Sequence, residues 1–171
     1  GKTQDYTDSF QRAIDFAHLN SLNDPTLKGS TVFVPNGNYR IKQVLLKSGI
    51  SLIGESINNT LIQSTVNHNV DYMFKIEAGP VFLKIENFSL FGRFETNAGC
   101  FLFDSEGSSN PPNHGGLWNS RISNINIKGF NGHGIHLLGG NGSSNYLLPN
   151  QFNIFENVRV FKNSDFSHAL Y

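Results

Sequence analysis

The spacing of apolar residues changes once along the chain, from the spacing of a helix to that of strands. Near the start, four apolar residues lie three or four positions apart, on one face of a helix: Phe10, Ala13, Ile14 and Ala17. Thr7 or Asp8 can cap this helix, and Asp8 with Gln11 resembles a capping box. We expect the helix to end before the Asn23-Asp24-Pro25 turn.

After this turn the residues favour strands. Val32-Phe33-Val34 leads into the turn Pro35-Asn36-Gly37-Asn38, and short β-rich segments separated by Gly and Asn continue to the C-terminus. The pattern predicts no second helix. It therefore does not favour a doubly wound sheet, in which strands alternate with helices.

A six-residue pattern recurs in this strand-rich part. It begins with Asn or Gly, continues with apolar, polar and apolar residues, and ends with Gly in three of the four copies. The copies span residues 49–54, 87–92, 124–129 and 157–162, so their first positions are 38, 37 and 33 residues apart. The two apolar positions lie two residues apart and therefore point to one side of a strand.

A repeat of this length predicts a solenoid. A single coil cannot bury its own apolar side, but coils stacked about 4.8 Å apart bury a continuous interior and pair each strand with the coils above and below. Asn87, Asn124 and Asn157 would then lie in one column and hydrogen-bond through their amides. The alternative is an antiparallel sandwich, which has turn signals every 8–12 residues, roughly, without a longer period.

We therefore predict an all-β fold, a right-handed parallel β-helix with a short N-terminal capping α-helix. Residues 1–28 would form the cap and a linker, and residues 29–171 the coils. Phe10, Ala13 and Ile14 would cover the apolar end of the first coil. The chain ends inside another coil without a polar cap, so we expect a truncated solenoid and a natural protein that continues.

Each repeated segment is followed by a second strand and then by a loop of variable length. We place the second strands at residues 61–62, 101–103 and 135–137, and the loops at 65–72, 104–117 and 139–150. Because these loops occupy the same place in successive coils, we expect them to stack on one side of the solenoid. Repeat proteins build a binding wall from insertions on one side.

The composition limits the possible partners. The chain carries 13 basic and 13 acidic residues, which leaves no basic excess for binding nucleic acid. Charged residues are 15% of the chain, whereas 22 Asn and 17 Gly suit tight turns and an amide-rich surface for hydroxyl-rich ligands. No apolar stretch is long enough to predict membrane insertion. Cys100 is the only cysteine, so an intrachain disulfide is excluded, and we expect its thiol to be buried.

Three blocks in the first third of the chain resemble the opening of the pectate-lyase-like β-helix superfamily: Thr7–Asp15, Thr31–Ile41 and Leu46–Glu55. Members of this superfamily include phage tailspike depolymerases, which the chain resembles most, and secreted pectinolytic or glucan-degrading enzymes. The resemblance implies a polysaccharide substrate, a homotrimer and an extracellular location, in a virion tail for a phage protein and secreted otherwise. The opening blocks are structural in the family, so they carry over no catalytic residue.

Two reaction types remain open. Glycoside hydrolysis needs two carboxylates that flank the scissile bond. Asp104 and Glu106 lie two residues apart at the mouth of the longest loop, and Glu95 lies on the preceding turn. A lyase needs a base, and cationic groups to stabilise the charge that develops beside a uronate carboxylate. Two arginines and three histidines could supply these groups: Arg121, Arg159, His114, His133 and His136.

The candidate substrate-binding residues are two aromatic residues that border the loops and two of these histidines: Trp118, Tyr146, His114 and His136. His136 alternates with Ile135 and Leu137, so we expect it to face outward. His133 and His136 lack the Cys or carboxylate neighbours of a zinc site, and we predict no metal and no cofactor. For each candidate, the alternative is an ordinary packing or surface role.

The sequence thus leads to the hypothesis of a phage tailspike depolymerase that binds and cleaves a bacterial capsular or surface polysaccharide. One alternative is a secreted pectate-lyase-like lyase or glycoside hydrolase. Another is a non-catalytic carbohydrate-binding shaft. The sequence leaves open the sugar, the linkage and the choice between lyase and hydrolase.

Overall fold

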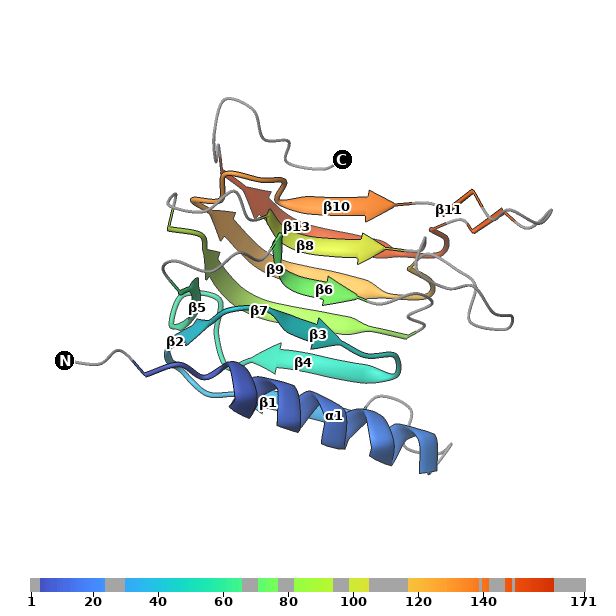
Figure 1. Cartoon of the computed structure of the whole chain (residues 1–171), viewed down its shortest axis with the longest axis horizontal. Helices are drawn as coiled ribbons and strands as arrows, with labels where there is room; N and C mark the ends of the chain where they lie inside the picture. Colours follow the sequence, from blue (N-terminus) through green and yellow to red (C-terminus); the bar gives the residue numbers. More distant parts are fainter. Residues whose placement is uncertain are drawn as a thin grey trace.

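The computed structural model describes residues 4–23, 30–65, 71–76, 82–93, 99–104, 117–138, 140–141, 147–148 and 150–161. Helix α1 (Thr7–Asn23) is the only helix within these residues. Figure 1 shows that α1 lies across one end of a stack of strands.

The strands wind in coils. The first coil contains β1 (Ser30–Val34), β2 (Gly37–Ile41) and β3 (Val44–Leu46), and the second contains β4 (Ile50–Gly54), β5 (Thr60–Ser64) and β6 (Tyr72–Ile76). The third contains β7 (Lys84–Phe91) and β8 (Gly99–Asp104), and the fourth contains β9 (Arg121–Lys128) and β10 (Ile135–Leu138). Strands β11 (Gly140–Asn141) and β12 (Leu147–Leu148) form a small antiparallel pair, and β13 (Ile154–Val160) follows.

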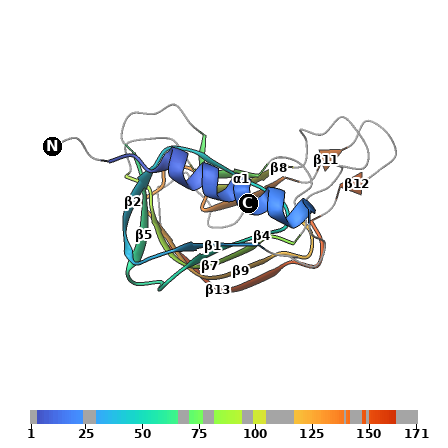
Figure 2. The same cartoon turned by 90° about the horizontal axis from the view of Figure 1, so that it is seen from below.

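Successive coils pair in parallel, which gives the stack three sides. The first side consists of β1, β4 and the first halves of β7, β9 and β13. The second side consists of β2, β5 and the second halves of the same three long strands. The third side consists of β3, β6, β8 and β10. Figure 2 shows the first side below α1 and the second side at its left. This is the right-handed parallel β-helix that the sequence predicts.

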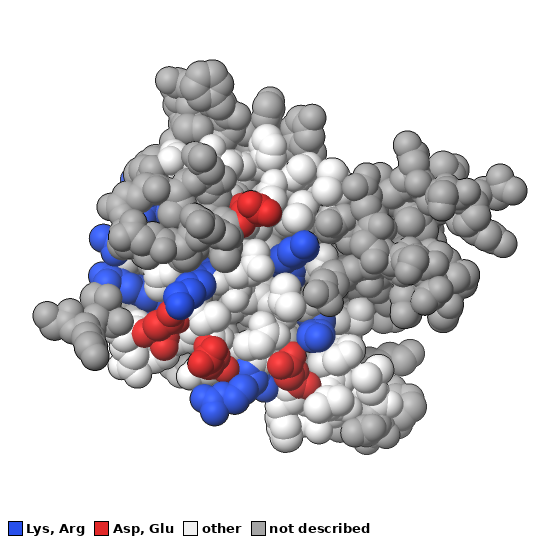
Figure 3. All heavy atoms as spheres, viewed as in Figure 1, with Lys and Arg blue, Asp and Glu red and all other residues white. Residues whose placement is uncertain are grey.

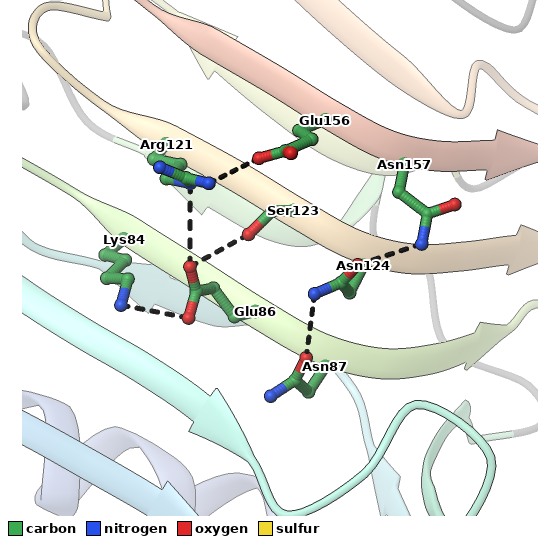
Figure 4. Close-up of polar contacts among 8 residues, drawn as sticks. All are labelled: Lys84, Glu86, Asn87, Arg121, Ser123, Asn124, Glu156 and Asn157. Atoms are coloured by element: carbon green, nitrogen blue, oxygen red, sulfur yellow. Dashed lines mark hydrogen bonds and ion pairs between the residues drawn. The ribbon is translucent and has the colours of Figure 1, made fainter.

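The predicted asparagine column forms the corner between the first and second sides. Asn87, Asn124 and Asn157 have φ angles of 64°, 53° and 50°, in the left-handed region that Asn tolerates better than most residues. The Asn124 amide donates to Oδ1 of Asn87 at 3.2 Å, and the Asn157 amide donates to Oδ1 of Asn124 at 2.8 Å. The column is therefore confirmed as a hydrogen-bonded ladder (Figure 4).

The structure corrects the register of the first repeated segment. Ser51 pairs with Lys84, so Gly54 rather than Gly49 lies level with Asn87. Gly49 also has a positive φ, 72°, and directly precedes a strand. Its position in the sequence is therefore similar to that of the corner asparagines, although it lies at another corner. A Cβ atom at residue 54 would lie 2.2 Å from the carbonyl oxygen of Asn87, which explains the glycine there.

The predicted equivalence of the second strands is also wrong in part. Leu61 and Ile62 pair with β7 on the second side, whereas residues 101–103 pair with residues 74–76 of β6 on the third side. The cause is a longer corner, residues 55–59, between β4 and β5, where later coils turn at a single Asn. Segment 65–72 therefore joins the second side to the third, while 104–117 and 139–150 join the third side to the first. The three loops do not leave from one corner.

Apolar side chains fill the interior between the three sides. The rings of Phe74 and Phe101 stack at 5.2 Å between centroids, and those of Phe101 and Phe103 at 5.9 Å. At the end of the stack, α1 buries Phe10, Ile14 and Ala17 against the first coil. Ala13 packs against the same cluster and is partly buried. The predicted apolar face of the helix and its capping role are confirmed.

The predicted capping box does not form. The Asp5 carboxylate accepts hydrogen bonds from the backbone and hydroxyl of Thr7, at 2.9 and 2.6 Å. Gln11 instead exchanges hydrogen bonds with the Leu45 backbone, at 3.0 and 2.8 Å. The Gln11 side chain therefore ties α1 to β3 and does not cap the helix.

Two further expectations concern burial and boundaries. Cys100 is fully buried on β8, as expected, and burial raises the pKa of its thiol. Among the described residues, no helix is long and apolar enough to cross a bilayer. The division between cap and coils at residues 28 and 29 stays a prediction, because residues 24–29 lie outside the described ranges.

Candidate functional site

The outer surface of the third side carries a group of polar side chains. Within β6, Lys75 lies between the buried Phe74 and Ile76, so strand alternation turns it outward. In register, Lys75 pairs with Leu102 of β8, and Leu102 pairs with His136 of β10. Lys75 and His136 are therefore two strand spacings apart, roughly 10 Å between backbones.

Tyr72 and His136 form the closest polar contact on this side. The Tyr72 hydroxyl lies 2.6 Å from Nδ1 of His136, and the two rings are tilted with centroids 5.8 Å apart. The hydrogen comes either from the phenol or from Nδ1, depending on the imidazole tautomer. The ring of His133 meets His136 edge-on at 4.9 Å. Three titratable side chains from two coils two levels apart thus lie together.

Gly99 makes this contact possible. It lies between Tyr72 and His133 in the register of the third side, and a Cβ atom there would lie 2.3 Å from Cε1 of Tyr72. Because residue 99 has no side chain, the Tyr72 ring can pass over the intervening strand and reach His136.

The pKa of Tyr72 favours a protonated phenol. Burial raises the pKa of this phenol, and the negative charge of Asp71 raises it further. At neutral pH the Tyr72 phenol is therefore protonated, and it lies beside an imidazole, the side chain whose ordinary pKa lies nearest neutrality. Such a pair can transfer a proton to or from a bound substrate.

The structure places the sequence-predicted catalytic residues differently. Asp104 ends β8 in the same sheet as His136, where it pairs with Leu138. Arg121 begins β9 on the first side. The described sheets therefore do not bring Arg121 and His136 together. Four candidates lie outside the described residues: Glu95, Glu106, His114 and Tyr146.

Arg121 takes part in a network of charges on the first side (Figure 4). Its guanidinium donates to the Glu156 carboxylate, and its Nε lies 3.7 Å from Oε1 of Glu86. Nζ of Lys84 lies 2.9 Å from Oε2 of Glu86, and the Ser123 hydroxyl donates to Oε1 at 2.9 Å. Burial by itself would raise the pKa of Glu86, but these hydrogen bonds and the two positive charges outweigh it and hold that pKa below its ordinary value.

Trp118 lies at the corner between the third and first sides, where it forms an isolated parallel bridge with Gln151. Its ring meets Phe152 edge-on, with centroids 6.3 Å apart. The indole Nε1 is buried and has no hydrogen-bond partner among the described residues. Ring packing rather than a hydrogen bond of the indole therefore holds the Trp118 side chain in place.

Charges of both signs are mixed on the face in Figure 3. Blue and red side chains alternate among white ones, and no large area of one sign gathers among the described residues of this face. Within the same residues, no group of three or more His, Cys, Asp or Glu side chains could hold a metal ion.

Sequence reasoning missed Tyr72 and Lys75. The alternation Phe74-Lys75-Ile76 could have placed Lys75 on the outside of a strand. Nothing in the sequence pairs Tyr72 with His136, because the two residues are 64 positions apart and their contact depends on the lengths of two coils.

Three parallel sides closed by an N-terminal helix define the class of pectate-lyase-like β-helix proteins. Residues 1–146 match the model of one family in this class, described as "Rhamnogalacturonase A/epimerase, pectate lyase-like". The chain belongs to this family.

Solved structures show the same fold. The chain is similar to a 1,3-α-1,4-β-D-galactose-4-sulfate-3,6-anhydro-D-galactose-2-sulfate 4 galactohydrolase, with 21% identity, a TM-score of 0.67 and coverage of 100% of this chain and 38% of that one. An iota-carrageenase from A. fortis is similar with 20% identity and a TM-score of 0.68, over 99% of this chain and 36% of that one. The A-module of a mannuronan C-5 epimerase from Azotobacter vinelandii is similar with 17% identity and a TM-score of 0.66, over 98% of this chain and 49% of that one.

These similarities extend to the fold and no further. The chain spans less than half the length of each of these three proteins. No curated protein matches the chain.

Proposed function

We propose that this chain is part of a polysaccharide-modifying enzyme, in which the third side binds an acidic polysaccharide and Tyr72 with His136 transfers protons to or from it. The observation that carries the proposal is the 2.6 Å contact between the Tyr72 hydroxyl and His136 Nδ1, a partly buried pair on the third side of the solenoid. Membership of a family described by a rhamnogalacturonase and an epimerase supports a carbohydrate substrate. Two structural neighbours named for sulfated galactan and for mannuronan support an acidic one.

The geometry favours proton abstraction beside a carboxylate over hydrolysis. Abstraction of the hydrogen α to a uronate carboxylate needs one group that accepts a proton and one that donates a proton, which an imidazole and a phenol can supply. A cation then stabilises the charge that develops on the carboxylate, and Lys75 lies outward in the His136 column. Loss of the leaving group would give a lyase, and return of the proton to the opposite face would give an epimerase.

Hydrolysis is the second candidate, and Asp104 supports it. This residue ends β8, two residues beyond Leu102, in the same sheet as His136. A hydrolase would need a second carboxylate across the scissile bond. Glu106 remains the sequence-based prediction for that second group.

One set of assays separates these reactions. The purified chain is incubated with rhamnogalacturonan, polygalacturonate, mannuronan and iota-carrageenan. New ultraviolet absorbance from unsaturated uronate indicates a lyase, and new reducing ends without that absorbance indicate a hydrolase. Inverted C-5 configuration by NMR, without chain shortening, indicates an epimerase. Binding without any product would overturn the enzymatic proposal and favour the non-catalytic shaft.

A matched pair of variants tests the role of Tyr72. Tyr72→Phe removes only the hydroxyl that contacts His136, and we expect kcat to fall by about 10²–10⁴, the usual contribution of a general acid or base. Tyr39→Phe is the control, because its hydroxyl hydrogen-bonds to Pro35 in the first coil. Full activity in Tyr72→Phe would show that the phenol takes no part in the reaction.

The finer predictions from sequence concern source and assembly. A bacterial capsular or surface polysaccharide as substrate, a place in a phage tail and a homotrimer all stay predictions, as does secretion. Light scattering of the purified protein gives the subunit number, and a monomer would contradict the trimer.

A further inference from the structure

A second column of left-handed residues runs along the corner between the third and first sides. Phe82, Asn119 and Phe152 have φ angles of 60°, 48° and 57°. Each lies two residues before a position that pairs in register on the first side: Lys84, Arg121 and Ile154. The corner therefore demands the same backbone conformation in three successive coils. Asn adopts this conformation readily, but a bulky aromatic residue does so only against steric strain.

The two phenylalanines gain little burial in return for this strain. Phe82 is 54% exposed and Phe152 is 73% exposed. Strained residues that folding alone does not favour commonly mark functional positions. An exposed phenyl ring in a strained position is therefore a candidate for ligand contact.

The corner holds the backbone of this column in place through hydrogen bonds from coil to coil. The Phe82 amide donates to the Trp118 carbonyl at 3.1 Å, and the Asn119 amide donates to the Gln151 carbonyl at 3.1 Å. The Trp118 and Phe152 rings meet edge-on, which restricts the Phe152 ring. A platform that is rigid before binding loses little conformational entropy when a ligand arrives.

We propose that Phe82 and Phe152, with Trp118 in contact with Phe152, form an aromatic platform that binds a polysaccharide along the solenoid axis. The apolar faces of pyranose rings pack on aromatic rings without requiring charge. The two phenylalanines are two strand spacings apart, roughly 10 Å, which is close to the length of a disaccharide. The ligand class rests on the proposed function, since a polysaccharide is the substrate inferred for the third side.

The platform lies along one edge of the third side, whereas Tyr72 and His136 lie toward the other edge, at the beginnings of β6 and β10. In Figure 1, β7, β9 and β13 begin at the right, where β6, β8 and β10 end. The platform residues directly precede the three beginning strands. A chain bound there lies beside the third side, so it would extend the contact area of a long substrate beyond the reacting sugar.

A sugar chain suits the platform better than a protein partner does. Two phenylalanine side chains cover about 150–250 Å² each when buried. A specific protein interface buries roughly 800 Å² on each partner. A single polysaccharide strand, in contrast, touches a protein along a narrow line.

The test is a double variant, Phe82→Asn with Phe152→Asn, compared with Phe33→Asn. Asn fits the left-handed corner, as Asn119 shows, so the double variant keeps the fold and relieves strain. Phe33 is 57% exposed on β1 and serves as a matched loss of one exposed ring. Retardation in native gels containing rhamnogalacturonan, polygalacturonate, mannuronan or iota-carrageenan measures binding without any need for turnover.

We expect the wild type and Phe33→Asn to be retarded by at least one of these polysaccharides. The dissociation constant of the double variant should rise about tenfold or more, while its melting temperature stays equal or increases. Unchanged retardation of the double variant, or no retardation of the wild type by any of the four, would overturn the platform. A lower subunit number in the double variant would also overturn it, because the rings would then belong to an interface between copies.

The outcome is separable from that of the proposed function. Retardation without any product would overturn the enzymatic proposal and leave the platform intact. Product formation with unchanged retardation in the double variant would do the reverse.

Discussion

The first and third sides of the solenoid use polar residues in different ways. On the first side, Glu86, Arg121 and Glu156 bond from one coil to the next, and the corner asparagines do the same. On the third side, Tyr72 passes over Gly99 to a histidine two coils away. A polar contact that repeats in successive coils holds those coils together, whereas a contact that occurs once and interrupts the repeat indicates a site. Substitutions on the two sides should therefore affect different properties.

The largest effect should come from His136→Gln on the third side. This change keeps a polar side chain but removes the group that accepts or donates a proton near neutral pH. We expect kcat to fall by about 10²–10⁴ while the free energy of unfolding changes by less than about 1 kcal/mol. Steady-state kinetics and urea unfolding of the same preparation check both. A large loss of stability would show that His136 has a structural role, like the asparagines of the ladder.

Gly54→Ala should destabilise the fold most among the changes near the asparagine corner. The new Cβ atom would lie 2.2 Å from the Asn87 carbonyl oxygen, a backbone atom that cannot move aside alone. Overpacking of this kind costs up to about 3 kcal/mol. The midpoint of urea unfolding measures the cost. Ile53→Val, one residue earlier on the same strand, is the control and should cost much less.

Asn124→Ala should lower the free energy of unfolding by about 2 kcal/mol. The change breaks two hydrogen bonds of the ladder. It also places alanine in a left-handed conformation, which alanine adopts less readily than asparagine does. Asn124→Gly loses the same hydrogen bonds but not the backbone preference, so it should cost less. Urea unfolding compares the two variants. Equal losses would mean that the side-chain ladder alone stabilises the corner.

Glu86→Gln should have the smallest effect, about 1 kcal/mol at pH 7, and the effect should depend on pH. The pKa of Glu86 is lowered from 4.5 in the folded chain, so the carboxylate stabilises the fold above that value. This contribution is lost as the pH falls through the folded pKa. The difference between wild type and variant should therefore narrow in acid, in unfolding curves from pH 7 to pH 3. Asp8→Asn, an exposed carboxylate on α1, is the control.

The sequence was informative where a local rule repeats. The helix face of Phe10, Ile14 and Ala17 follows from spacing, and the Asn87–Asn124–Asn157 column follows from a period. It misled where coil lengths change. The corner at residues 55–59 moved the first repeated segment out of register, and Gly49 imitated a corner residue through its own positive φ.

The candidate site was harder to predict for the same reason. His136 could be placed on the outside of a strand from its apolar neighbours. Its contact with Tyr72 depends on how two coils of unequal length wind between them, and on the missing side chain at Gly99. Arg121 illustrates the opposite case. Its type suggested chemistry, but its acidic neighbours in space come from β7 and β13 and are not adjacent in sequence.

The single-residue asparagine corner has a consequence for engineering. Because β7, β9 and β13 turn there without any intervening loop, an added residue would displace a ladder amide and disrupt pairing in the coils on both sides. New segments are better grafted at the other two corners, where the connections already vary in length. The asparagine corner then keeps a constant geometry, so designed variants of the chain can be superposed on it.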